Sequence, residues 1–245
     1  MTHRVFVAGA SGAIGTALVP LLVAAGYTVF GSTRRADRVK KLEDAGVAPV
    51  VVDVFDAAAL RDALARIAPD SVIHQLTDLP AALDPALMAQ AVAANARIRD
   101  EGTQNLVAAA ISAGCKRMIA QSIAWAYRPG VTPYDENCPL DLDAQGMRRT
   151  SVRGVAALER HVLTTAPLVG TVLRYGQIYG PGTGADSPTG SSPLHVDAAA
   201  YGALLALQRG TAGVFNIAQD DAEFSSAKAK RELGWSPDMR SATRA

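Results

Sequence analysis

Three glycines spaced three residues apart form the clearest chemical motif of the chain. Gly9, Gly12 and Gly15 follow a short apolar run that begins at Val5, and a long uncharged segment comes after them. A glycine turn between a strand and a helix lets a pyrophosphate approach the backbone, where the first N–H groups of the helix bind its oxygens. The pattern therefore predicts a dinucleotide site, to which we assign Gly9, Ser11, Gly12, Ala13, Ile14 and Gly15.

A second polar cluster follows the next expected strand. Ser32, Thr33, Arg34 and Arg35 are consecutive, and no acidic residue occurs before Asp37. Proteins that bind NAD usually carry an acidic residue here for the ribose hydroxyls, whereas arginines suit the 2′-phosphate of NADP. We expect NADP as the cofactor, with NAD as the alternative, held by Thr33, Arg34 and Arg35. An ordinary solvated, basic start of a helix is the simpler explanation of the same residues.

These residues need a scaffold in which strands and helices alternate. Apolar runs typical of buried strands cover 5–8, 27–32, 50–52, 71–74, 117–121, 169–174 and 214–217, and helical patterns cover 11–25, 35–45, 57–68, 85–113, 147–163, 197–208 and 226–233. The alternation predicts an α/β fold, a Rossmann-type doubly wound parallel sheet with helices on both faces. Ligands of such sheets bind at the carboxyl ends of the strands, where Asp53 and Val54 are placed to meet an adenine. Asp56 and Asp197 are expected to cap helices.

Two long loops divide the chain into a core and a lobe. Residues 1–174, completed by about 195–217, are expected to form the NADP-binding Rossmann domain. The segments 123–146, 175–194 and 218–245 are expected to form a small, reduced C-terminal substrate lobe within the same structural unit. Loops of this length in a compact domain are usually functional, which predicts a substrate site beneath the lobe.

Further segments make the chain resemble the extended short-chain dehydrogenase/reductase family, in particular its epimerase/dehydratase-like branch. Beyond the glycine turn, the similarity rests on residues 72–77, Asn95, 102–106, 120–122, 173–182 and 234–237. The resemblance implies a bound nicotinamide dinucleotide and a homodimer formed through the helices 85–113 and 147–163. It also implies cofactor contacts from Gln75, Leu76, Thr77, Asn95, Gln121, Arg174 and Ile178, with Ser122 at the position of the family's catalytic Ser or Thr.

The chain lacks the Tyr-x-x-x-Lys pair on which the chemistry of that family relies. In the family, the tyrosine exchanges a proton with a substrate oxygen, and the lysine lowers the tyrosine pKa. No lysine lies between positions 117 and 227 of this chain. Alignment on Glu159 puts Ser151 and Val155 at the two motif positions. The pair is therefore replaced and has not merely moved along the chain.

Other residues must then carry the proton chemistry. We expect Ser122 to donate a hydrogen bond to the substrate oxygen and Tyr127 to act as the acid, with Tyr134 as the alternative donor. A nearby arginine is expected to supply the missing positive charge, and the candidates are Arg148, Arg149 and Arg153. The plain structural alternatives are a loop tyrosine with its hydroxyl in water and a serine that only ends a strand.

Three functions are compatible with these residues. The first is an NADP-dependent oxidoreductase that transfers hydride between nicotinamide and a carbonyl or alcohol of a small molecule. The second is a non-catalytic NAD(P)-binding sensor or regulatory protein, which the missing pair favours. The third is a nucleotide-sugar epimerase or dehydratase, which the resemblance suggests but which needs strong proton transfer.

His74, at the end of the fourth expected strand, is predicted to be a packed core histidine.

The composition narrows the class of partner. The chain has 24 Lys and Arg against 23 Asp and Glu, a net charge of +1, which gives no basic footprint for nucleic acid. The uncharged stretch from Val5 to Thr33 is interrupted by glycines and a proline, so we expect no membrane span. Cys115 and Cys138 indicate reduced thiols in a cytoplasmic protein, and no metal site is expected.

Overall fold

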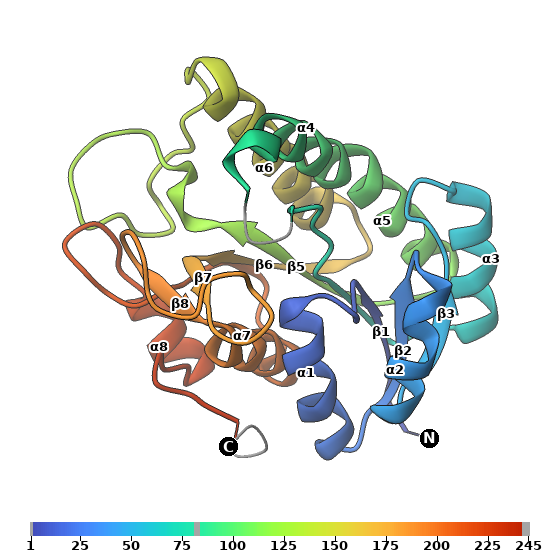
Figure 1. The fold of residues 1–245 in the computed structure, drawn as a ribbon. Helices are drawn as coiled ribbons and strands as arrows, with labels where there is room; N and C mark the ends of the chain where they lie inside the picture. The colour runs from blue at the N-terminus through green and yellow to red at the C-terminus, as the bar shows by residue number, and fades with distance from the viewer. Residues whose placement is uncertain (1, 81–83, 242–245) are drawn as a thin grey trace.

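Seven parallel strands form the central sheet of the computed structural model, which describes residues 2–80 and 84–241. The strands lie in the order β3-β2-β1-β4-β5-β6-β9 (Figure 1). Their bounds are β1 Arg4–Ala8, β2 Thr28–Thr33, β3 Ala48–Val51, β4 Ser71–His74, β5 Arg117–Ile123, β6 Val169–Tyr175 and β9 Gly213–Ile217. The strand order reverses between β1 and β4, as in a doubly wound sheet. The predicted Rossmann-type fold is confirmed.

Helices cover both faces of this sheet (Figure 1). One layer consists of α1 Ala13–Ala24, α2 Val39–Asp44, α7 Val196–Arg209 and α8 Ala227–Leu233, and the other of α3 Ala57–Ile67, α4 Met88–Arg97, α5 Thr103–Ser112 and α6 Gly146–Thr164. Side chains alternate along each strand, so Val5 and Val7 of β1 pack into the first layer, and Phe6 and Ala8 into the second. This two-sided burial explains why the strands read as continuous apolar runs.

The helix predicted over 85–113 is interrupted in the structure. A 3-10 turn, Pro85–Leu87, leads into α4, and a π-helical segment labelled η4, Ile98–Gly102, separates α4 from α5. The Thr103 hydroxyl donates to the Ile98 carbonyl at 3.3 Å. A Cβ at Gly102 would lie 3.0 Å from Cγ1 of Val54, so the wide turn passes close to the segment after β3. Segments of this kind occur often at functional sites.

The loop after β6 contains structure that the sequence analysis did not predict. The short strands β7 Gln177–Tyr179 and β8 Pro193–His195 pair in parallel, apart from the main sheet. The prediction that Asp197 caps α7 is wrong, because His195 is the N-cap and its Nδ1 accepts the backbone N–H of Asp197 at 3.2 Å. The prediction for Asp56 is confirmed, since its carboxylate accepts the N–H of Ala59 at 2.9 Å.

Candidate cofactor and substrate site

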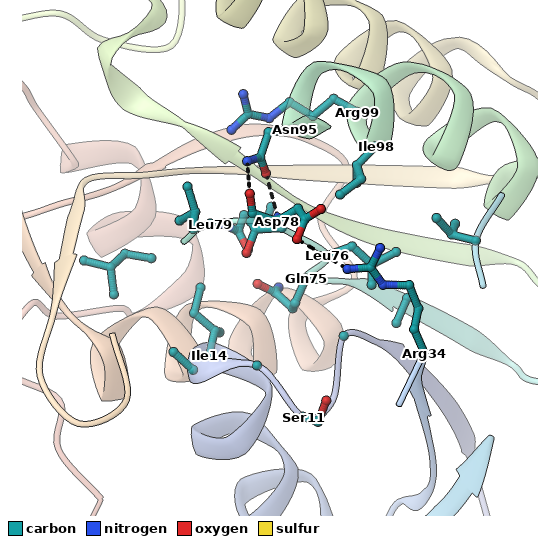
Figure 2. Close-up of a pocket in the computed structure, with 18 of the residues that line it drawn as sticks. Ser11, Ile14, Arg34, Gln75, Leu76, Asp78, Leu79, Asn95, Ile98 and Arg99 are labelled. Carbon is teal, nitrogen blue, oxygen red and sulfur yellow. Dashed lines mark hydrogen bonds and ion pairs between the residues drawn. The ribbon is translucent and has the colours of Figure 1, made fainter. Parts of the chain in front are cut away.

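A cavity of about 990 Å³ opens at the carboxyl edge of the sheet (Figure 2). It is bordered by the β1–α1 turn, the ends of β2, β4 and β5, the η4 segment and the loop after β6. Most of the residues assigned to the cofactor from the sequence line it: Gly9, Ser11, Gly12, Ala13, Ile14, Thr33, Arg34, Arg35, Val54, Gln75, Leu76, Thr77, Asn95, Gln121 and Ile178. Five of the assigned residues do not line it: Gly15, Asp53, Ser122, Tyr127 and Arg174.

The glycine turn has the geometry that a phosphate needs. Gly9 adopts φ +87°, and a Cβ there would lie 2.9 Å from the Gln75 carbonyl oxygen. Gly12 is the N-cap of α1 and offers no side-chain cap, so the first N–H groups of the helix remain available to an anion. A Cβ at Gly15 would lie 2.3 Å from the Gly9 carbonyl oxygen, so Gly15 serves the packing of the turn. The cradle fits a dinucleotide pyrophosphate.

Three arginines surround the corner of the cavity at the end of β2. Arg34 pairs with Asp78 across the cavity at 3.3 Å, as Figure 2 shows, and Arg35 pairs with Asp37 at 2.6 Å. Arg38 donates from Nη1 to the Ser11 carbonyl at 3.1 Å and also lines the cavity. The sequence analysis did not assign Arg38 to the cofactor. Its closeness in sequence to Arg34 and Arg35 was the one feature that could have indicated this role. The corner is rich in guanidinium groups, which suit a phosphate.

Asp53, expected to meet the adenine, does not line the cavity. Its Oδ1 accepts the backbone N–H of Phe55 at 2.9 Å, so the carboxylate closes the turn after β3 and stays exposed. Val54 and Phe55 form the cavity wall there in its place. Such a bond is common, because a short polar side chain readily bonds the backbone two residues ahead. The contact of Asp53 with an adenine stays a prediction.

The segment after β4 is held in place by Asn95. Its Oδ1 accepts the Asp78 N–H at 3.1 Å, and its Nδ2 donates to the Asp78 carbonyl at 2.9 Å (Figure 2). The same Nδ2 donates to the Ala91 carbonyl at 2.8 Å. These bonds occupy most of the side-chain amide. Asn95 therefore lines the cavity chiefly as a support for the loop that carries Leu76 and Thr77.

His74 is the packed core histidine that the sequence predicted. Its side chain is buried, Nδ1 accepts the Leu76 N–H at 3.1 Å, and Nε2 lies 3.1 Å from the Thr103 hydroxyl. Burial, with a smaller contribution from the charge of Arg99, lowers the pKa of His74 to about 4. The imidazole is therefore neutral at pH 7 and donates from Nε2.

Ser122, Tyr127 and Arg174 belong to a buried polar network behind the cavity. The Ser122 hydroxyl donates to Oε1 of Glu159 at 3.0 Å, and Arg174 donates to both oxygens of Glu159 at 2.9 and 2.7 Å. The Tyr127 hydroxyl donates to Oδ1 of Asn216 at 2.6 Å, and burial raises the pKa of Tyr127 to about 12. The carboxylate of Glu159 holds Ser122 and Arg174 away from the cavity, so the structure does not bring the expected proton donors to it.

Ser151 and Val155, which the sequence analysis places at the two motif positions, are neutral residues. Ser151 lines the cavity from the first turns of α6, whereas Val155 is fully buried. Arg148 is engaged by Asp141 at 2.8 Å and by the carbonyl oxygens of Trp125 and Tyr127. It therefore fixes the loop after β5 and does not supply a charge to the cavity.

The sequence analysis missed Arg99, which lines the cavity from the η4 segment. Its side chain is half-buried, and burial lowers its pKa to about 10, so it remains protonated at pH 7. No residue in the described part of the chain forms a hydrogen bond or ion pair with it. Oε1 of Gln75 and Oε1 of Gln121 are likewise buried without a donor in the same part of the chain. These groups are open to a ligand.

The model of the NAD dependent epimerase/dehydratase family matches residues 5–244. A Streptomyces protein named 3-diazoavenalumate denitrifying reductase is 39% identical over 240 residues, which is 89% of this chain and 76% of the relative. UDP-glucose 4-epimerase of Thermotoga maritima has a TM-score of 0.75 at 19% identity, with 97% of this chain and 94% of that one covered. WbmG of Bordetella bronchiseptica, solved with NAD, has a TM-score of 0.73 at 21% identity, with 98% and 90% covered.

A Rossmann sheet with a glycine cradle at its carboxyl edge is typical of a dinucleotide-binding protein. This chain belongs to the NAD-dependent epimerase/dehydratase family, which confirms the resemblance seen in the sequence. The relative at 39% identity is a reductase, which supports an NAD(P)-dependent oxidoreductase. Within 2–80 and 84–241, we find no helix long and apolar enough to cross a membrane, and no cluster of side chains suited to a metal ion.

Proposed function

We propose that the protein is an NADP(H)-dependent reductase whose hydride transfer needs no tyrosine proton donor. The observation that carries the proposal is a complete cofactor cradle beside an α6 with Ser151 and Val155 at the motif positions. The hydroxyls of Ser122 and Tyr127 are engaged in the buried network, which favours a structural role for both. Bound NADPH would supply hydride from C4 of its nicotinamide ring.

The chemistry of the substrate decides whether a proton donor is needed. Hydride addition to a carbonyl leaves an alkoxide, which must take up a proton. Reduction of an aromatic diazonium ion differs, because hydride forms the C–H bond while the C–N bond breaks and its electron pair leaves with N₂. No proton enters or leaves that reaction. The Streptomyces relative is named for reductive denitrification of a diazo compound. We propose reductive loss of nitrogen from an aromatic diazo compound for this chain also.

The residues that line the cavity would divide the work between the two ligands. The N–H groups after Gly12 would bind the pyrophosphate, and Arg34 and Arg38 would bind the 2′-phosphate. Trp125 and Leu79, two partly exposed apolar residues that line the cavity, would pack against the ring of the substrate and exclude water. The specificity for NADP over NAD is part of this proposal.

Reduction of a carbonyl is the second candidate. It is favoured by the hydroxyl of Ser151, which lines the cavity at the position of the family tyrosine and could donate a hydrogen bond to a substrate oxygen. Ser122 and Tyr127 would serve this reaction only after release from Glu159 and Asn216.

The test uses NADPH deuterated at the transferable C4 position and 3-diazoniobenzoate, prepared from 3-aminobenzoate and nitrite. The proposal predicts N₂ release, NADPH oxidation and benzoate that carries one deuterium at ring carbon 3. A Gly12→Asp variant is the matched control, because a carboxylate at the N-cap repels the pyrophosphate. Benzoate without deuterium, or with the same yield in the control, contradicts the proposal. Tight NADPH binding without turnover of this probe or of a carbonyl panel supports the sensor function.

A further inference from the structure

Arg99 lies on the opposite wall of the cavity from the glycine turn. Figure 2 shows Arg99, Ile98 and Asn95 on one side and Ser11 and Ile14 on the other. Ile98 is buried at the cavity wall and anchors the η4 segment, and the next residue, Arg99, also lines the cavity. The π turn thus projects a cation into the cavity from a well-packed element.

The acidic residues close to Arg99 in the sequence and in the cavity are already paired. Asp100 accepts from His161 at 2.9 Å, and Glu101 accepts from Arg97 at 2.7 Å. Asp78 pairs with Arg34. A half-buried guanidinium without a counter-charge in the described residues is stabilised by any anion that enters the cavity.

The cofactor phosphates have other partners. In the proposed function, the pyrophosphate would bind at the N-terminus of α1, and the 2′-phosphate at the corner formed by Arg34, Arg35 and Arg38. Arg99 does not belong to either group, because it lies across the cavity from the glycine turn (Figure 2). Its charge is therefore left for the second ligand of the cavity, the substrate.

The other groups around the substrate space describe the rest of that ligand. Trp125 and Leu79 are large apolar side chains that line the cavity and remain partly exposed, which suits a planar, apolar body. Oε1 of Gln121 is buried without a donor in the described chain, so it could accept a hydrogen bond from a hydroxyl or N–H group on the ring of the substrate. We propose that Arg99 binds the carboxylate of an aromatic acid, and that the substrate of this protein is such an anion. The inference rests on the proposed function in that the cavity holds a substrate beside the cofactor.

The experiment measures binding by calorimetry to the full chain saturated with NADP⁺, with 3-hydroxybenzoate and its neutral methyl ester as probes. Because Arg99 is expected to form charge-assisted hydrogen bonds to the carboxylate, Arg99→Gln should weaken binding of 3-hydroxybenzoate by roughly 10- to 100-fold. Binding of the methyl ester should stay within about threefold of the wild type. Arg99→Lys should restore part of the loss. Arg160→Gln, which removes an exposed arginine from α6, is the control and should change neither probe.

Three results would overturn the proposal. The first is that the carboxylate does not bind to the wild-type chain, and the second is that Arg99→Gln weakens binding of acid and ester equally. The third is that Arg99→Gln weakens NADPH binding by the same factor, which would mean that Arg99 contacts the cofactor. Failure of the reductase proposal is distinguishable, because anion binding that depends on Arg99 can persist without hydride transfer to any diazonium probe.

Discussion

Arg174 is buried and Arg99 is half-buried, but only Arg174 has an acidic partner among the described residues. Burial lowers the pKa of each, but for Arg174 the hydrogen bonds and charge of Glu159 more than offset that effect and raise it above its usual range. Arg174 also lies 4.8 Å over the ring of Tyr127. Arg99 has no such partner among the described residues. The first guanidinium is part of the structure, and the second is available to a ligand.

This comparison separates the two halves of the site. On the substrate side, β5 and α6 hold the residues of the family's proton chemistry, and here Glu159 ties Ser122 and Arg174 into a structural network. On the cofactor side, the backbone of the glycine turn and the basic corner remain open to phosphates. The structure therefore leaves the cradle expected for the cofactor open, while Ser122 and Arg174 are held by Glu159 and Val155 is buried.

The largest expected effect is on the structural arginine. Glu159→Leu leaves the charge of Arg174 buried and unpaired, since the two side chains are only 5% and 8% exposed. We expect a loss of about 3–5 kcal/mol in the free energy of unfolding, measured by urea denaturation. The double variant Glu159→Leu with Arg174→Met should recover much of this loss. A single variant as stable as the wild type would remove the distinction between the two arginines.

A pH effect follows from His74, which is close enough to Arg99 to feel its charge. An unfolded histidine titrates near pH 6.5, whereas the pKa of the folded His74 is about 4. The contribution of the neutral, buried His74 to the free energy of unfolding is therefore complete above pH 6.5. It falls as the pH drops toward 4, because the unfolded chain then binds a proton that the folded chain does not. The shift corresponds to roughly 3 kcal/mol. We expect the difference in stability between the wild type and His74→Asn to shrink over this interval. A difference independent of pH would contradict the buried, neutral state.

The cofactor corner should show a smaller, selective effect. Replacing Arg34 and Arg38 together by alanine is expected to weaken NADPH binding by roughly 10- to 100-fold, because only NADPH carries the 2′-phosphate. The affinity for NADH should stay within about threefold. Fluorescence titration measures both constants. Arg61→Ala, an exposed arginine on α3, is the matched control. Equal losses for both cofactors would refute the preference for NADP.

Local pattern predicted much of this molecule, and what it could not predict depends on where distant segments meet. The alternation of strands and helices and the turn at Gly9 are short-range features, and both lie where they were expected. Ser122 was assigned to the substrate because it ends β5, but its partner Glu159 lies on α6, 37 residues away. The assignment of Ser122 and Tyr127 to catalysis stays a prediction, as does the homodimer.

Arg99 shows the same limit from the other side. The helix pattern over 85–113 continues through Arg99 without a break, since a π turn inserts a residue into the backbone and leaves no signal in composition. Only the folded chain shows that this arginine faces the cavity while Arg97, two residues earlier, pairs with Glu101 outside it.

The most direct test of the central claim is turnover of the Ser122→Ala, Tyr127→Phe double variant with 3-diazoniobenzoate and deuterated NADPH. If hydride transfer needs no proton donor, the variant should keep its rate of deuterium transfer within about threefold of the wild type, with no solvent isotope effect in D₂O. A general acid contributes about 10²- to 10⁴-fold to a rate. A loss of that size in a folded variant that still binds NADPH would contradict the account.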